Sequence, residues 1–372
     1  VYTATLNNPV TGTPLVVTLS GGTTITIPVG QSTASSAAVP VRANDAYIQG
    51  TQAVVASITG TTGGNFEALT TTSTVSTNVV DDADATTVTL TASAASVTEG
   101  GSIVYTATLN NPVTGTPFVV TLSGGTTITI PVGQNTASSA AVPVRADDAY
   151  VQGTQAVVAS ITGTTGGNFE ALTTTSTVST SVTDDADATT VTLTASAASV
   201  TEGGSIVYTA TLNNPVTGTP LVITLSGGTT ITIPVGQSTA SSAAVPVRAD
   251  DAYVQGTQAV VASITGTTGG NFEALTTTST VSTNVVDDAD ATTVTLTASA
   301  ASVTEGGSIV YTATLNNPVT GTPLVVTLSG GTTITIPVGQ STASSAAVPV
   351  RADDAYVQGT QAVVASITGT TG

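Results

Sequence analysis

Apolar and polar residues alternate along most of the chain, in short runs separated by turn residues. In residues 103–109 the odd-numbered positions are Ile103, Tyr105, Ala107 and Leu109, and the positions between them are mostly threonine. A period of two together with many β-branched residues predicts strands with one buried face. No segment keeps a helical period, so the pattern predicts an all-β protein.

Between about residues 85 and 187 the pattern predicts seven strands. They are expected at residues 87–97 (with a break at Ser93 and Ala94), 103–109, 118–122, 126–132, 136–145, 155–161 and 173–183. Asn, Gly and Pro residues lie between the runs, as turns require. Pro143, inside the fifth run, indicates an edge position or a bulge. Seven short strands in about 100 residues predict an immunoglobulin-like (Greek-key) β-sandwich.

The whole pattern recurs every 103 residues, almost letter for letter. Residues 1–6 return as residues 104–109, 207–212 and 310–315. A unit of this size can enclose its own core and is therefore a domain. We expect tandem immunoglobulin-like domains in a linear rod. The expected domains are 1–84 (lacking its first strand), 85–187, 188–290 and 291–372 (lacking its last strand).

Composition excludes several classes of function. The chain has no Cys, His, Lys, Met or Trp, and its four Arg face 22 acidic residues, for a net charge of -18. Nucleic acid and anionic lipid are bound through Lys and Arg, so we expect neither a nucleic-acid partner nor direct membrane contact. General bases and nucleophiles at neutral pH are usually His, Cys or Lys. We therefore expect no enzymatic activity.

Most carboxylates of a repeat are predicted to gather at one pole of its sandwich. Alternate loops of an antiparallel sandwich lie at opposite ends, so the turn at Glu99, the loop at Asp147 and Asp148 and the exit segment 184–187 share one end. Crowded carboxylates repel one another, and Ca²⁺ takes six to eight oxygen ligands. No His or Cys is present to favour zinc or copper. We predict Ca²⁺ sites at this pole; the alternative is solubilising surface charge.

The predicted ligands are the acidic residues of these three segments in every repeat. They are Asp45, Asp81, Asp82, Asp84, Glu99, Asp147, Asp148, Asp184, Asp185, Asp187, Glu202, Asp250, Asp251, Asp287, Asp288, Asp290, Glu305, Asp353 and Asp354. The exit segment is also the linker and has no flexible spacer, so bound Ca²⁺ would stiffen it. The next repeat could add Asn213 and Asn214, or Asn271 and Glu273. Asn44 replaces an Asp in the first repeat, so the first junction should bind metal less well.

Two further residues each have two interpretations. Tyr150, just before the sixth strand, is either a corner tyrosine that bonds back to its own repeat or a rim aromatic. Glu170 either reaches the junction that precedes its repeat or is solvated, and its place in a loop favours solvation.

Several segments resemble the tandem extender repeats of large RTX-type adhesins of Gram-negative bacteria. They are the opening 190–193, the turn 199–204, the strand 207–212 and the linker 184–187. The resemblance implies immunoglobulin-like folds, linkers made rigid by calcium and a location on the bacterial cell surface. It also implies a monomeric rod that projects distal binding domains, as in biofilm formation or ice attachment. The glycine-rich nonapeptides that name the RTX group are absent.

The alternative function is a direct binding module, either homophilic as in cadherins or a Ca²⁺-dependent glycan binder. A cadherin junction also draws a Glu, a loop acid and an Asp-rich linker to one pole. Aromatic residues and Arg, the usual anchors of interfaces, are nearly lacking here. Their scarcity favours the spacer, whose partners are calcium ions and the neighbouring repeats.

Overall fold

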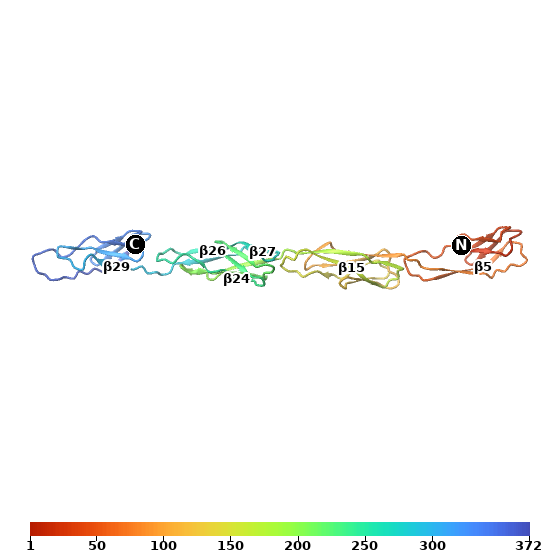
Figure 1. Cartoon of the computed structure of the whole chain (residues 1–372), viewed down its shortest axis with the longest axis horizontal. Coiled ribbons are helices and arrows are strands. Elements are labelled where there is room, and N and C mark those ends of the chain that lie inside the picture. Colours follow the sequence, from red (N-terminus) through yellow and green to blue (C-terminus); the bar gives the residue numbers. More distant parts are fainter. The chain divides into compact units, whose positions relative to one another are not determined.

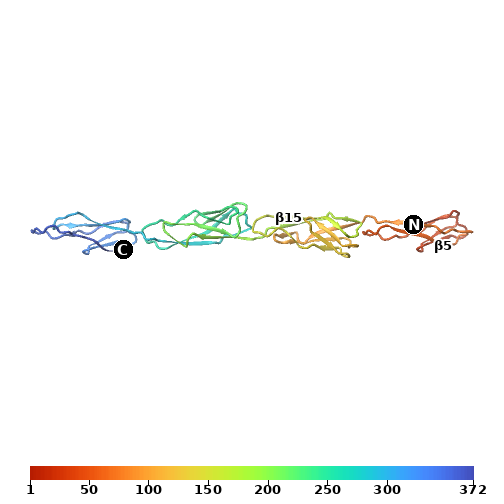
Figure 2. The same cartoon turned by 90° about the horizontal axis from the view of Figure 1, so that it is seen from below.

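The computed structural model describes residues 1–372, and all of its regular elements are β-strands. Its contacts divide the chain into two compact units, one of residues 1–148 with 152–185 and one of residues 149–151 with 186–372. Figures 1 and 2 show that the strands of each repeat pack together as a separate group. No element is a helix of the length and apolarity that crossing a membrane requires.

The second repeat, in the first unit, is a complete sandwich. Its strands are β7 (Ala85–Ala92), β8 (Ser96–Thr98), β9 (Ser102–Ile103), β10 (Tyr105–Leu109), β11 (Phe118–Leu122), β12 (Thr127–Ile130), β13 (Thr136–Ser138), β14 (Val142–Pro143), β15 (Gln155–Thr165), β16 (Ala171–Thr173) and β17 (Thr177–Thr183). One sheet has the order β13-β10-β7-β16 and the other the order β12-β11-β15-β17-β8. The prediction of an all-β, immunoglobulin-like fold is confirmed.

The first predicted strand changes sheets at its break. β7 pairs antiparallel with β10, with Ala92 opposite Tyr105, whereas β8 runs parallel to β17, with Val97 opposite Val182. The residues between them carry the chain from one sheet to the other. The prediction of one broken strand over residues 87–97 therefore has the break in the right place. It does not include the change of sheet that occurs at the break.

Other predicted strands also differ in their bounds: the run 103–109 is divided into β9 and β10, and the run 126–132 is shortened to β12. The run 136–145 is two strands, β13 and β14, and β14 with Pro143 pairs only with the two-residue strand β9. Pro143 thus lies at an edge, as predicted. The run 155–161 continues to Thr165, and the run 173–183 is divided into β16 and β17.

The alternating pattern places the apolar residues in a dry core. Ile103, Tyr105, Ala107 and Leu109 are buried as predicted, and Phe118 is the largest fully buried side chain. Each repeat has its own apolar cluster. At roughly 25 cal/mol for each Å² of apolar surface removed from water, these clusters are the main force that holds each repeat together.

The first repeat completes the first unit. Its strands are β1 (Thr3–Thr5), β2 (Leu15–Leu19), β3 (Thr24–Ile27), β4 (Thr33–Ser35), β5 (Gln52–Thr62) and β6 (Thr74–Val79). They form a sheet of order β3-β2-β5-β6 and the pair β1-β4.

The second unit contains the third and fourth repeats, which follow the same plan. The third has β18 (Ala188–Ala195), β19 (Ser199–Thr201), β20 (Ser205–Ile206), β21 (Tyr208–Leu212), β22 (Leu221–Leu225), β23 (Thr230–Ile233), β24 (Thr239–Ser241), β25 (Val245–Pro246), β26 (Gln258–Thr268), β27 (Ala274–Thr276) and β28 (Thr280–Val286). The fourth has β29 (Val294–Ala298), β30 (Ser308–Ile309), β31 (Tyr311–Leu315), β32 (Leu324–Leu328), β33 (Thr333–Ile336), β34 (Thr342–Ser344), β35 (Val348–Pro349) and β36 (Ile367–Thr371).

Candidate metal site

Main-chain hydrogen bonds hold three separate segments together at one pole of the second repeat. The N–H of Glu99, in the turn after β8, donates to the carbonyl of Thr183 at 2.9 Å, and the N–H of Gly100 donates to the carbonyl of Arg145 at 2.9 Å. Gly100 has φ +69°, and a Cβ there would lie 2.9 Å from the Cβ of Asp147. Only glycine allows the loop that carries Asp147 to approach this closely.

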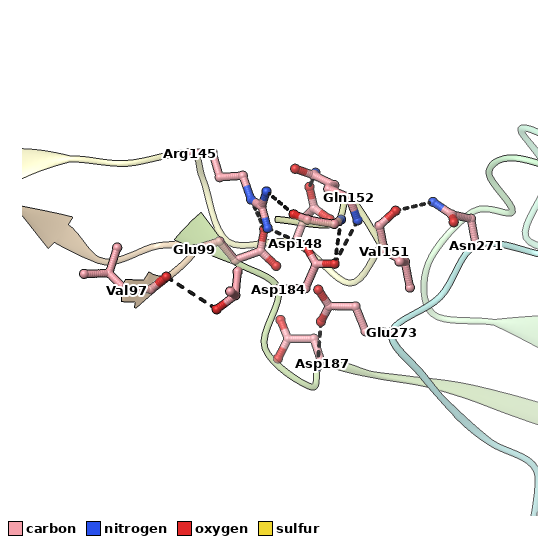
Figure 3. Close-up of polar contacts among 12 residues, drawn as sticks. Val97, Glu99, Arg145, Asp148, Val151, Gln152, Asp184, Asp187, Asn271 and Glu273 are labelled. Atoms are coloured by element: carbon pink, nitrogen blue, oxygen red, sulfur yellow. Dashed lines mark hydrogen bonds and ion pairs between the residues drawn. The ribbon is translucent and has the colours of Figure 1, made fainter. Parts of the chain in front are cut away.

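One guanidinium joins the same three segments. Arg145 donates from Nε to Glu99 Oε2 at 3.0 Å, from Nη1 to the carbonyl of Gly153 at 2.8 Å and from Nη2 to Asp184 Oδ1 (Figure 3). The other oxygen of Asp184 accepts from the N–H groups of Gln152 at 3.0 Å and Gly153 at 2.8 Å. Asp184 therefore serves to close the loop between β14 and β15.

The arginine clamp is repeated along the chain. Arg248 pairs with Glu202 at 3.2 Å and with Asp287, and Arg42 pairs with Asp81. In the fourth repeat Arg351 pairs with Glu305 at 3.1 Å.

Glu99, which pairs with Arg145 through Oε2, has one carboxylate oxygen without a partner. The residue is 3 % exposed, and its Oε1 is buried and accepts no hydrogen bond. Carboxylate oxygens of Glu99, Asp147 and Asp185 lie within 4.8 Å of one another. A buried charge is costly unless it is paired or coordinates a metal. These all-oxygen donors, drawn from three segments, fit a hard divalent cation such as Ca²⁺.

The equivalent acids gather in the third repeat. Carboxylate oxygens of Glu202, Asp250 and Asp288 lie within 4.8 Å of one another. The nearby carboxylates of Asp250 and then Asp288 raise the pKa of Asp290 above its ordinary value, because like charges disfavour ionisation. Negative charge is thus concentrated at this pole as well.

A third group of acids shows that Glu170 reaches the preceding junction. Carboxylate oxygens of Asp82, Asp84 and Glu170 lie within 4.8 Å of one another, and the N–H of Asp84 donates to Glu170 Oε2 at 3.1 Å. The expectation that Glu170 is solvated is wrong, because its loop docks on the loop of the first repeat. Asn44 donates its amide to Asp84 Oδ2 at 2.8 Å, so one carboxylate oxygen there already has a neutral partner.

Another set of predicted ligands instead shapes the loop that precedes β5, β15 or β26, or the equivalent loop of the fourth repeat. Each member of this set accepts from the side chain of a glutamine four residues later. The pairs are Asp45 with Gln49, Asp148 with Gln152, Asp251 with Gln255 and Asp354 with Gln358. Asp45, Asp251 and Asp354 also accept from the N–H of the tyrosine two residues on, which is the bonding of an Asx turn.

The remaining predicted residues are placed individually. Asp187 donates its N–H to Glu273 Oε2 at 2.9 Å (Figure 3). Asp353 lies beside Gly306: a Cβ added to Gly306 would lie 2.9 Å from the Cβ of Asp353. The proposed extra ligand Asn213 instead accepts from Thr190 N–H at 2.7 Å, at the start of β18.

Tyr150 does not form a tyrosine corner. Its hydroxyl donates to the carbonyl of Pro215 at 2.9 Å, and its ring centroid lies 5.8 Å from that of Phe272. Both partners belong to the third repeat, with which residues 149–151 are grouped. The corner interpretation is therefore wrong, and local sequence gave no sign of the true partner.

These features define a class of protein: tandem immunoglobulin-like sandwiches, each with an acid-lined pole where it meets its linker. The chain belongs to the LapA domain family, whose model matches residues 1–83, 84–185, 187–289 and 290–372. The match confirms the resemblance to adhesin repeats and points to a structural, non-enzymatic protein of the extracellular space or cell surface. No curated protein matches the chain.

Two solved structures are similar to the chain over most of its length. One is described as a tetra-tandem repeat in the extending region of a large adhesion protein, with 20 % identity, a TM-score of 0.27 and coverage of 94 % of this chain and 86 % of that one. The other is a D1–D4 ectodomain fragment of ICAM-5, with 16 % identity, a TM-score of 0.26 and coverage of 94 % of both chains. At these TM-scores neither likeness bears on function.

Proposed function

We propose that the four repeats are an extender segment of a Gram-negative cell-surface adhesin, in which Ca²⁺ at the acidic pole of each repeat stiffens the connection to the next. The segment is a monomeric spacer that holds distal adhesive domains away from the cell, as biofilm formation requires. Membership of the LapA domain family supports the extender role. The observation that carries the calcium proposal is the buried Glu99, with one carboxylate oxygen lacking a hydrogen bond beside Asp147 and Asp185.

The residues divide into two roles in this proposal. Glu99, Asp147 and Asp185 hold the ion in the second repeat, and the equivalent acids hold it in the third. The aspartates bound to arginine, such as Asp184, fix the exit segment against the loop. Bound Ca²⁺ supplies the positive charge that lets the carboxylates remain close together. A segment tied at three points has little freedom to bend.

Calcium binding is tested by isothermal titration calorimetry and by melting with and without EDTA. A ligand present at about 100 times its Kd stabilises the folded state by about 2.7 kcal/mol. For a domain of about 100 residues this raises Tm by on the order of 10 °C. We expect the variant Glu99→Gln with Asp185→Asn to lose binding at that repeat. The matched control Glu67→Gln removes an exposed acid of the first repeat and should leave the titration unchanged. An unchanged melting curve in EDTA would contradict the proposal.

Sedimentation velocity distinguishes the spacer from a homophilic binding module. A spacer stays monomeric when Ca²⁺ is added and becomes more extended, which lowers its sedimentation coefficient slightly. A homophilic module associates in Ca²⁺ and sediments faster as concentration rises. Concentration-dependent association at micromolar protein would replace the spacer by the cadherin-like alternative.

A further inference from the structure

The loop that precedes β5 in the first repeat forms a short β-bridge with a loop of the second repeat. In the first unit, Tyr47 and Phe169 form an isolated antiparallel bridge. Ile48 N–H donates to the carbonyl of Asn168 at 3.1 Å, and Asn168 Nδ2 donates to the carbonyl of Ile48 at 3.0 Å. The main chain of Ile48 in the first repeat thus forms hydrogen bonds with both the main chain and the side chain of Asn168 in the second.

The Tyr47 ring extends the core of the second repeat. Its centroid lies 5.8 Å from that of Phe169, which in turn meets Phe118 edge to face at 5.5 Å. Tyr47 packs against the apolar cluster of the second repeat, and its hydroxyl donates to the carbonyl of Pro112 at 2.8 Å. Such a ring, apolar in its body and polar at its tip, is a typical anchor of a specific interface.

The same arrangement recurs in the second unit. The centroids of Tyr150 and Phe272 lie 5.8 Å apart with the same tilt of 33° as in the first unit. Val151 N–H donates to Asn271 O at 3.1 Å, and Asn271 Nδ2 returns a bond to Val151 O at 2.9 Å (Figure 3). The same geometry in two repeats of nearly identical sequence shows that the contact is a property of the repeat and not of one loop.

The tyrosine part of the contact recurs in the third repeat. Tyr253 donates its hydroxyl to the carbonyl of Pro318 at 2.9 Å, as Tyr47 does to Pro112 and Tyr150 to Pro215. The hydroxyl bond is therefore present at all three connections between repeats.

The receiving loop is shaped in advance by two glycines. A Cβ on Gly166 would lie 2.1 Å from the carbonyl oxygen of Pro117, and a Cβ on Gly167 would lie 2.7 Å from the ring of Phe169. Both have positive φ, of 79° and 70°. The pair therefore allows the Phe169 ring to lie close to the main chain of its own loop.

We propose that residues 46–48 of one repeat and residues 168–170 of the next, with Phe118 and Pro112, form an aromatic latch by which each repeat docks on a following copy without metal. Its contacts are tilted and edge-to-face aromatic rings, main-chain hydrogen bonds and one amide, and none of the hydrogen bonds described above uses a carboxylate oxygen. Chelation leaves such contacts in place. The partner of this surface is a second repeat of the same sequence. Residue 170 contributes only its N–H to the latch, while its carboxylate belongs to the acid group with Asp82 and Asp84.

Distance measurements between spin labels test the latch in the full chain. The chain has no Cys, so Val55→Cys and Val158→Cys introduce unique labels at equivalent positions of the first and second repeats, each 59 % exposed. In EDTA we expect one narrow distance between the labels. Tyr47→Ala combined with Asn168→Ala should lose that narrow distance. Tyr356→Ala removes the same residue from a loop without a receiving partner and should leave it unchanged.

A broad distribution for the labelled parent in EDTA would overturn the proposal, as would a narrow one for the double variant. Tyr47→Phe keeps the ring and loses only the bond to Pro112, so it should retain the narrow distance. Circular dichroism melting shows that the variants keep their sandwiches, since Tyr47 and Asn168 lie in surface loops. Adding Ca²⁺ to the double variant is a separate test: renewed narrowing supports the calcium proposal whether or not the latch exists.

Discussion

At the scale of single residues, burial and charge conflict most strongly at Glu99. The side chain is almost fully covered, yet only one of its oxygens has a protein partner, the Nε of Arg145. Glu202 occupies the same position in the third repeat, with its own arginine at 3.2 Å.

Removing this charge should destabilise the second repeat. Breaking a buried ion pair by changing one partner costs about 3 kcal/mol. We therefore expect Glu99→Gln to lower the free energy of unfolding by about that amount, measured by urea denaturation followed by circular dichroism. Glu305→Gln is the matched control, because its side chain is 25 % exposed; a pair near the surface contributes below about 1 kcal/mol. Equal effects of the two changes would contradict this account.

The sequence allowed the buried positions to be predicted, but not the contacts between repeats. Ile103 and Leu109 follow from alternation, because a strand sends every second side chain to the core. The solvated interpretation of Glu170 and the corner interpretation of Tyr150 are wrong, because the partners of these residues lie in other repeats. No local pattern encodes which face of a repeat meets its neighbour. The only available sign was an aromatic residue and an acid side by side in a loop.

At the scale of elements, the loop between β15 and β16 depends on its glycine pair. Gly166 and Gly167 give the main chain a shape that brings it against Pro117 on one side and against the Phe169 ring on the other. The short strand β16 then pairs with β7, with Leu172 opposite Thr86. One tight turn therefore positions both an aromatic anchor and the last strand of a sheet.

A methyl group at this turn should be more harmful than one at another glycine of the same conformation. Gly124 has φ +86°, and a Cβ added there would meet no atom within 4 Å, so Gly124→Ala carries only the cost of positive φ, about 1 kcal/mol. Gly167→Ala adds overlap with the Phe169 ring, for a total of about 3 kcal/mol. Calorimetric melting of the two variants compares them directly. Similar losses would show that the ring does not constrain the loop.

The change of sheets by the first strand was beyond local reasoning. β8 runs parallel to β17, although Val97 and Val182 are far apart in the chain. Ser93 and Ala94 mark the break, but they do not say which sheet receives the next residues. Pro143 was more informative, because a residue without an N–H is confined to an edge.

At the scale of the whole molecule, the net charge of -18 is large and is unevenly distributed over the chain. Four arginines face 22 acids, and most of those acids lie at the poles. The folded chain therefore repels itself unless cations gather on it. Diffuse salt and site-bound calcium relieve the same repulsion in different ways.

Sodium chloride should therefore stabilise the chelated protein more than the calcium-loaded one. At an ionic strength of 1 M the screening length falls to about 3 Å, so repulsion between exposed carboxylates farther apart than this is largely screened. We expect Tm in EDTA to rise steadily with sodium chloride, and Tm in excess Ca²⁺ to change little. A series of melting curves at increasing salt checks this. Parallel rises in both conditions would mean that no carboxylate group holds an ion.

Each repeat has a single basic side chain, and in the first three repeats this arginine clamps the exit segment. Arg42, Arg145, Arg248 and Arg351 are also the only positions at which a protease of trypsin-like specificity could cut. While the clamps hold, those peptide bonds lie in a loop tied down by carboxylates and carbonyls. We expect such a chain to resist digestion while the clamps hold. A cut after Arg145 would fall between β14 and β15, inside one sandwich, and would therefore destroy that repeat while the other copies stay folded.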